Sequence, residues 1–124
     1  MNTIKVSDND IKVMVSVFVY LDTEHPDGDM YVAYCPSLNL VGYGNGEEAA
    51  KKDFEWVMGD YFGDMLSQGT LEKDLLKLGW ASSRRLFSEP MVSDMMTSNK
   101  QLRDVIDGGN YRNVNIGKTC HACV

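Results

Sequence analysis

The feature that most constrains this chain is a run of strict alternation from residue 11 to residue 21. Every odd position in the run is aliphatic, whereas the even positions hold charged, hydroxyl, thioether and aromatic side chains. A period of two residues places alternate side chains on opposite faces of an extended chain. The pattern therefore predicts one long β-strand that buries its odd face. The aliphatic set is Ile11, Val13, Val15, Val17, Val19 and Leu21.

The residues after this strand predict a β-hairpin and then a third strand. Residues 22–29 combine a proline with an Asp-Gly pair, a composition typical of turns. Residues 30–35 are predicted to form the returning strand, which Pro36 ends because proline has no amide hydrogen for the ladder. Residues 38–43 follow as a third strand before the Gly44-Asn45-Gly46 break. The three strands predict an antiparallel meander.

Between Glu47 and Ser67 the hydrophobic period changes to 3.6 residues, which predicts an amphipathic helix on one face of the sheet. We expect Asn45 to cap its start, with Glu48 as the reciprocal partner of a capping box. A shorter helix over residues 71–78, begun by Thr70 and ended by Gly79, completes a β-β-β-α-α order. The apolar arc of the long helix consists of Ala50, Phe54, Val57, Met58, Tyr61 and Met65.

Residues 80–124 are expected to form a C-terminal α/β extension. Trp80–Phe87 is predicted as one strand, and a Ser98/Gln101 capping box predicts a helix that ends at Asp107. Alternating apolar residues predict a final strand over residues 112–119.

No Pro/Gly/Ser-rich linker separates residues 1–79 from residues 80–124. We therefore expect the extension to pack on the same domain as the β-β-β-α-α core, which gives an α+β fold class. The chain has 124 residues, of which 44% are hydrophobic, enough for one core. The longest apolar run is far shorter than the roughly 20 residues of a membrane-spanning helix. No secretory signal pattern opens the sequence, so the expected compartment is the cytoplasm.

Charge is distributed unevenly along the chain. Residues 1–79 carry 14 acidic and 6 basic side chains, whereas residues 80–124 carry 4 acidic and 6 basic side chains. An acidic surface repels phosphate and steers a basic protein toward it. The charge of the first part therefore favours a basic protein as its partner.

The cysteines and histidines do not form a convincing metal or catalytic pattern. Cys120-His121-Ala122-Cys123 has the spacing of zinc and thiol–disulfide sites, and Cys35 could complete a set of ligands. A zinc site normally has a second pair of ligands at defined spacing, and a redox pair begins a helix. His25 lies in a turn with no nucleophile near it in the sequence. We therefore expect no metal ion and no hydrolytic triad.

The other candidates for catalysis are better explained by turn and helix-start chemistry. Asp27 and Asp29 fall in a turn, and Glu47 and Glu48 fall at a helix start, where the helix dipole favours acids. The glycine-rich residues 42–46 lack the lysine and hydroxyl of a phosphate loop. We predict no catalytic residue and no cofactor, so the protein is not expected to be an enzyme.

The outer face of the long helix carries Trp56 beside Gly59 and Gly63, together with Lys52 and Ser67. A glycine within a helix costs about 1 kcal/mol relative to alanine, so two of them indicate a close approach to the backbone. Either residues 80–124 cover this face or another chain does. We favour the first explanation, because the extension has apolar residues that need burial. These are Leu86, Phe87, Met91, Val92, Met95, Met96, Leu102, Val105 and Ile106.

Several short motifs, taken in order, resemble the HicB-like antitoxins. A strand over residues 13–21 and the turn Asp27-Gly28-Asp29 lead to a second strand that ends in Pro36-Ser37-Leu38. The glycine loop of residues 42–46 then precedes the helix start Glu47-Glu48-Ala49-Ala50. The resemblance covers about residues 12–79.

This resemblance implies a truncated ribonuclease H-like fold and an antitoxin that neutralises a small, basic, mRNA-cleaving toxin of the HicA type. It does not imply ribonuclease activity, because residues 11–21 contain no carboxylate that could hold a metal ion. Many members carry a C-terminal DNA-binding domain, but residues 80–124 show no pattern of such a domain.

We therefore predict a protein that masks a basic toxin by contact. The expected partner-binding residues are Glu24, Asp27, Asp29, Glu47, Glu48, Trp56, Asp60 and Asp64. The alternative hypothesis is an RNA- or DNA-binding regulatory protein that uses Arg84, Arg85, Lys100, Arg103 and Arg112. We also expect a homodimer or a higher homo-oligomer, because the edge strands of a meander have unpaired amides.

Overall fold

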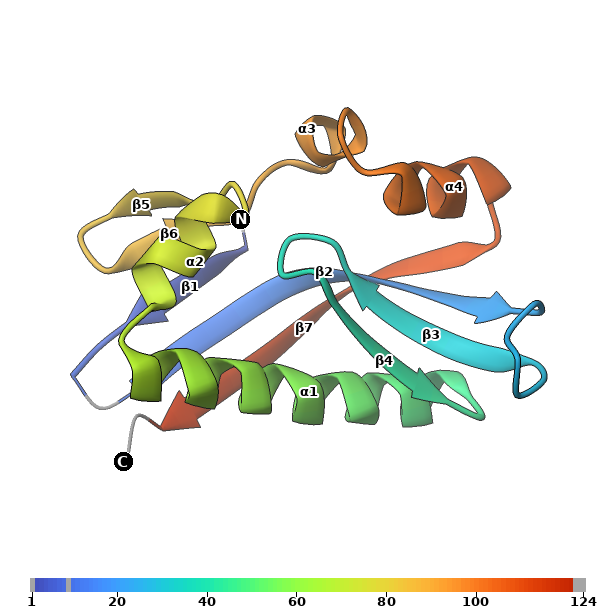
Figure 1. Cartoon of the computed structure of the whole chain (residues 1–124), viewed down its shortest axis with the longest axis horizontal. Helices are drawn as coiled ribbons and strands as arrows, with labels where there is room; N and C mark the ends of the chain where they lie inside the picture. Colours follow the sequence, from blue (N-terminus) through green and yellow to red (C-terminus); the bar gives the residue numbers. More distant parts are fainter. Residues whose placement is uncertain (1, 9, 122–124) are drawn as a thin grey trace.

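The computed structural model describes residues 2–8 and 10–121, which form a seven-stranded sheet and four helices (Figure 1). The strands are β1 Thr3–Val6, β2 Asp10–Asp22, β3 Met30–Cys35, β4 Leu40–Gly44, β5 Ala81–Ser83, β6 Leu86–Ser88 and β7 Tyr111–His121. The helices are α1 Glu47–Gln68, α2 Leu71–Lys77, α3 Val92–Met96 and α4 Lys100–Gly108. The predicted α+β class is confirmed. No helix in the described residues combines the length and the apolar character that crossing a membrane requires.

The central strand of the sheet is β2, and each of its partners is antiparallel to it. Along one edge, β7 pairs with β2 over its whole length, from His121 opposite Asp10 to Tyr111 opposite Tyr20. The other edge is shared, because β1 pairs with the first part of β2 and β3 pairs with the last part. The sheet continues from β3 to β4, and from β1 through β6 to β5. The meander β2–β3–β4 is thus present, but it belongs to a larger sheet than the predicted one.

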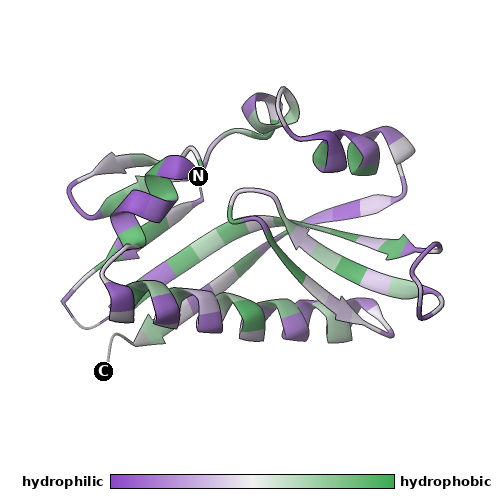
Figure 2. Cartoon of the chain, in the orientation of Figure 1, coloured by the Kyte–Doolittle hydropathy of each residue, from purple (hydrophilic) through white to green (hydrophobic). Residues whose placement is uncertain are grey.

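Helix α1 packs on one face of the sheet and forms the main core. Its buried residues recur at helical spacing and meet the odd-numbered side chains of β2, as the alternation predicts. Phe62 is fully buried although it lies outside the predicted arc, whereas Val57 and Tyr61 are half-buried. Figure 2 shows hydrophobic residues gathered along β2 and β3 and alternating with hydrophilic ones along α1.

The C-terminal helices lie over the opposite face of the sheet. Leu102 of α4 is buried there against Phe18, Val32 and Tyr34. The expectation that residues 80–124 cover the outer face of α1 is therefore wrong for Trp56, although Lys118 of β7 lies beside Gly59. On that face Trp56 is 69% exposed. Much of the apolar set of the extension is buried against the sheet instead, although Leu86 and Met91 remain exposed.

Four short elements depart from the prediction. Trp80–Phe87 is not one strand, because β5 and β6 form a hairpin in which Arg84 and Arg85 have φ angles of 49° and 66°. Non-glycine residues adopt such angles in turns, and apolar periodicity does not reveal them. The strand β1 and the helix α3 were not predicted, because each is too short to show a period.

The two predicted capping boxes are also wrong. Helix α1 starts after Gly46, which has no side chain to cap it, and Glu48 pairs with Lys51 at 3.1 Å instead. Helix α4 starts after Asn99, whose Oδ1 accepts a hydrogen bond from the Leu102 amide at 3.0 Å. The helix starts themselves lie within one residue of the predicted positions.

Glu89 closes a gap in the sheet. Because β1 and β3 share one edge of β2, Ser16 lies between the two pairings. The Glu89 carboxylate accepts hydrogen bonds from the Ser16 amide at 3.1 Å, from Asn2 Nδ2 at 3.0 Å and from Ser37 Oγ. A side chain thus takes the place of a strand at this point and satisfies the Ser16 amide.

Candidate partner-binding surface

Five of the eight predicted partner-binding residues lie at one end of the molecule. The turn between β2 and β3 carries Glu24, Asp27 and Asp29, and the first turn of α1 carries Glu47 and Glu48. Figure 1 shows this turn and the start of α1 at the same end of the sheet. We call these five residues the acidic end.

Local hydrogen bonds fix the shape of the turn. The Glu24 amide donates to Asp22 Oδ1 at 3.0 Å, and the Asp27 amide donates to His25 Nδ1 at 3.1 Å. Gly28 has a φ of 97°, a left-handed geometry that favours glycine. The His25 ring also lies 5.5 Å from the ring of Tyr43 on β4, which ties the turn to the neighbouring strand. The turn carboxylates are therefore presented from a defined scaffold.

The start of α1 is fixed by its contact with β4. A Cβ at Gly42 would lie 2.4 Å from the Phe54 backbone nitrogen, and one at Gly44 would lie 2.5 Å from the Ala50 nitrogen. Only glycine permits this approach, which brings the first turn of α1 beside the end of β4. Glu47 pairs with Arg112 of β7 at 2.7 Å. Both glutamates also lie where the helix dipole favours negative charge.

The other three predicted residues lie farther along α1. At 1.5 Å per residue, Asp60 and Asp64 are about 20–25 Å from the helix start, so they form a second group. Asp53 accepts a hydrogen bond from the Tyr43 amide at 2.8 Å, so its side of α1 faces β4. Asp60 follows Asp53 by seven residues and Asp64 follows four later, so both continue along this side. Trp56 points outward between this side and the side of α1 that faces β7.

The basic residues of the alternative hypothesis are dispersed. Arg84 and Arg85 lie in the β5–β6 turn, Lys100 and Arg103 on α4, and Arg112 on β7. Arg85 pairs with Asp8, Lys100 with Asp104 and Arg112 with Glu47. Arg103 donates to the carbonyl oxygens of Met96 and Thr97. The structure does not gather these side chains into one basic patch.

Cys35 lies in the main core, where its Sγ is 3.3 Å from Ser37 Oγ. Burial raises the pKa of this thiol to about 12. It therefore stays protonated, so it is a poor nucleophile and metal ligand. Burial also raises the pKa of Cys120 on β7. The candidate motif extends to Ala122 and Cys123, which lie outside the described residues. Within residues 2–8 and 10–121, no group of three His, Cys, Asp or Glu side chains could hold a metal ion.

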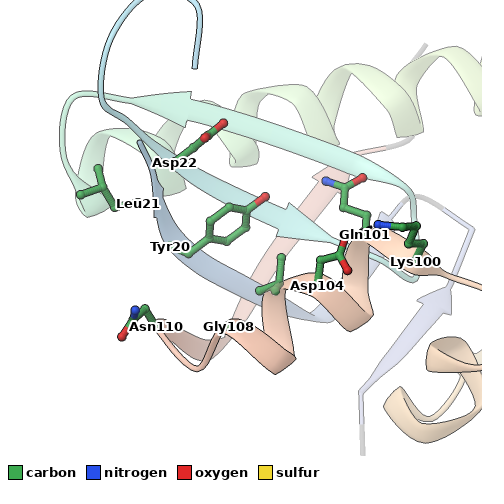
Figure 3. A pocket seen from close by; sticks show the side chains of 9 residues that line it. Tyr20, Leu21, Asp22, Lys100, Gln101, Asp104, Gly108 and Asn110 are labelled. Carbon is green, nitrogen blue, oxygen red and sulfur yellow. Dashed lines mark hydrogen bonds and ion pairs between the residues drawn. The ribbon is translucent and has the colours of Figure 1, made fainter. Parts of the chain in front are cut away.

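A hollow of about 510 Å³ lies between the end of β2 and α4 (Figure 3). Its polar lining consists of Tyr20, Asp22, Lys100, Gln101, Asp104 and Asn110. Burial raises the pKa of the Tyr20 phenol above 10.0, and a hydrogen bond with Gln101 opposes this effect. No serine, cysteine or histidine is among the residues that line this hollow. Its shape and side chains offer a recess for binding.

Sequence reasoning missed Tyr43, which is 47% exposed and lies beside the acidic end. The signal was present, because Tyr43 stands between Gly42 and Gly44 on a strand whose two glycines face α1. The side chain of Tyr43 must then point away from the helix.

Comparisons with family models, with curated protein sequences and with solved structures find nothing that matches this chain.

Proposed function

We propose that this protein is an antitoxin-type binding protein that masks a small, basic, RNA-cleaving toxin by contact. The observation that carries the proposal is the acidic end. Glu24, Asp27 and Asp29 are exposed, and no lysine or arginine in the described residues lies within ion-pair distance of them. Within the acidic end, Glu47 and Glu48 pair with Arg112 and Lys51, and Asp27 lies 4.0 Å from the His25 ring. The turn carboxylates, which have no lysine or arginine partner, are available to pair with such residues on another protein.

In this mechanism the acidic end steers the partner and Trp56 anchors it. Complementary charges raise the association rate, and their effect falls as salt screens them. A tryptophan that becomes buried at an interface typically dominates the binding energy. Asp60 and Asp64 extend the contact along the side of α1 that faces β4. The partner is neutralised because the chain covers the basic surface with which it binds RNA, and no bond is made or broken.

The resemblance of residues 12–79 to the HicB-like antitoxins supports the same conclusion independently of the charge argument. The alternative function, RNA or DNA binding through Arg84, Arg85, Lys100, Arg103 and Arg112, has weaker support. Four of these five side chains are already engaged within the chain, and phosphate binding would have to break those contacts.

The test coexpresses the tagged chain with any small basic protein that a neighbouring reading frame encodes. We expect the two to co-purify at about 100 mM salt and to separate progressively as salt rises to about 500 mM. A variant with Glu24→Lys, Asp27→Lys and Asp29→Lys should weaken binding about tenfold or more.

The matched control carries Asp8→Lys, Glu72→Lys and Asp94→Lys, which change the net charge equally at exposed positions away from the acidic end. This control should bind like the wild type. Equal weakening by both variants would show that overall charge, and not the acidic end, governs association. Absence of binding at low salt would count against the proposal as a whole.

A further inference from the structure

Strand β7 has a long outer edge that no other strand covers. It pairs with β2 on one side over eleven residues, and within the described residues no strand pairs with its other side. The register with β2 is continuous, so no bulge bends the strand, and the strand contains no proline. Natural proteins usually protect an edge of this length, because its free amides and carbonyls invite another strand.

The hydrogen bond between Ser16 and Glu89 shows which residues of β7 face outward. The Ser16 amide points to the side of β2 away from β7, so even-numbered residues of β2 bond on that side and odd-numbered ones bond with β7. Val15 and Val17 therefore bond with Ile116 and Val114. The alternate residues of β7 direct their main-chain groups to the free edge. These are Asn113, Asn115, Gly117 and Thr119, and all four are exposed.

The other two edges of the sheet are less suited to pairing with a long strand. β5 has three residues, and β4 has five. On β4, the Tyr43 amide is already bonded to the carboxylate of Asp53. Only β7 among the described strands combines length with an open edge.

We propose that β7 pairs with β7 of a second copy of this chain, antiparallel across a two-fold axis at Ile116. This register centres the pair on the midpoint of Tyr111–His121, so the whole strand is used. On the order of ten main-chain hydrogen bonds form, and the two sheets join into one. Asn113 lies opposite the partner copy's Thr119, and Asn115 lies opposite its Gly117.

The charges of β7 favour this register over the neighbouring one. With the axis at Ile116, Lys118 lies opposite Val114 of the second copy, and Arg112 lies opposite Cys120. Moving the axis to Asn115 would place Arg112 directly opposite Lys118, and like charges directly opposed destabilise a sheet. The register at Ile116 therefore avoids directly opposed like charges.

The side of α1 that faces β7 has little bulk. A Cβ at Gly59 would lie 3.2 Å from Cε of Lys118 on β7, and a Cβ at Gly63 would meet no atom within 4 Å. The two α1 helices lie on the same face of the joined sheet, and Gly59 leaves room there for the side chain of Lys118.

The first test removes one outward amide. Asn115→Pro deletes an N–H that is not bonded to β2, so the monomer should fold while the joined sheet cannot form. Asn115→Ala is the matched control, because it also loses the hydrogen bond from Asn2 Nδ2 but keeps the amide. By light scattering, wild type and Asn115→Ala should have twice the chain mass of 13.9 kDa, and Asn115→Pro should have 13.9 kDa with an unchanged circular dichroism spectrum. A monomeric wild type at about 100 µM, or a dimeric Asn115→Pro, overturns the proposal.

The second test determines which residues of the two β7 strands lie opposite each other, and it does not depend on the folding of the proline variant. Asn113→Cys and Thr119→Cys are made separately in chains that also carry Cys120→Ser and Cys123→Ser. A short bis-maleimide should join the two only when they are mixed, because each new thiol faces the other variant's thiol. A mixture of Asn113→Cys with Asn115→Cys is the control and should not crosslink, because in this register the two thiols are offset by four residues, about 13 Å along the strand. Crosslinking of each variant with itself, or none in the first mixture, contradicts the register at Ile116.

Discussion

Replacement of Glu89 tests whether a side chain holds the sheet together where β1 and β3 meet β2. Glu89→Ala removes hydrogen bonds from Ser16, Asn2 and Ser37. A hydrogen bond to a charged group contributes roughly 1.5–3 kcal/mol, and an unpaired buried amide costs about 1–3 kcal/mol. Because Glu89 is only half-buried, the lower end of these ranges applies. We expect Glu89→Ala to lower the free energy of unfolding by about 3 kcal/mol.

Glu89→Gln keeps the shape and one acceptor oxygen, so its expected loss is about 1–1.5 kcal/mol. Urea unfolding followed by circular dichroism measures both values from the midpoint and slope. A loss of about 3 kcal/mol corresponds to a fall in Tm of roughly 10 °C for a domain of this size. The matched control is Glu72→Ala, at an exposed glutamate of α2, which should change the unfolding free energy by less than about 0.5 kcal/mol.

Amide hydrogen exchange locates the effect. In Glu89→Ala the Ser16 amide should exchange faster, because water reaches it once the carboxylate is gone. The Val17 amide faces β7 and should change no more than global stability requires. If Glu89→Ala is no less stable than Glu72→Ala, the carboxylate does not close the gap and the reasoning is refuted.

The remaining predictions concern a thiol and two glycines. Burial raises the pKa of Cys35 from 9.0 to about 12, so the folded protein holds this proton more tightly than the unfolded chain does. The resulting stability is complete below pH 9 and falls by about 1.4 kcal/mol per pH unit between pH 9 and about 12. Urea unfolding at about pH 8 and about pH 10 measures this fall, and Cys35→Ala should make it smaller. An equal fall in Cys35→Ala would contradict the assignment. Gly42→Ala forces a Cβ against the Phe54 backbone, so it should cost more than about 3 kcal/mol. Gly63→Ala should gain about 0.5–1 kcal/mol in the same assay, because no atom lies near its Cβ position. A wild-type-like Gly42→Ala would refute the tight contact between β4 and α1.

The local elements of residues 10–79 could be predicted because burial leaves a period in their sequence. The alternating valines of β2 indicate which face of the strand packs against α1. Pro36 marks the end of β3, because proline cannot donate a main-chain hydrogen bond. The capping prediction for α1 failed, because the N-cap is Gly46, which has no side chain to identify it in the sequence. The contact of Gly42 and Gly44 with the helix fixes its start instead. That contact is between elements and has no local signature.

The arrangement of the sheet could not be predicted for the same reason. The sequence predicts β7 as a strand, but its pairing with β2 joins residues far apart in the chain. The acidic end depends both on local sequence patterns and on contacts between distant elements. Asp27 and Glu47 are each recognisable as surface acids, whereas their gathering depends on β3 and β4 returning the chain to the same end.

A calorimetric titration of this chain with a small basic protein that a neighbouring reading frame encodes tests the central claim most directly, when it is paired with an RNA-cleavage assay. The account predicts a Kd below about 1 µM at about 100 mM salt, at least tenfold weaker binding by the Glu24, Asp27 and Asp29 charge-reversal variant, and loss of RNA cleavage at equimolar chain. No heat of binding at low salt, or equal binding by the charge-reversal variant, would contradict masking by the acidic end.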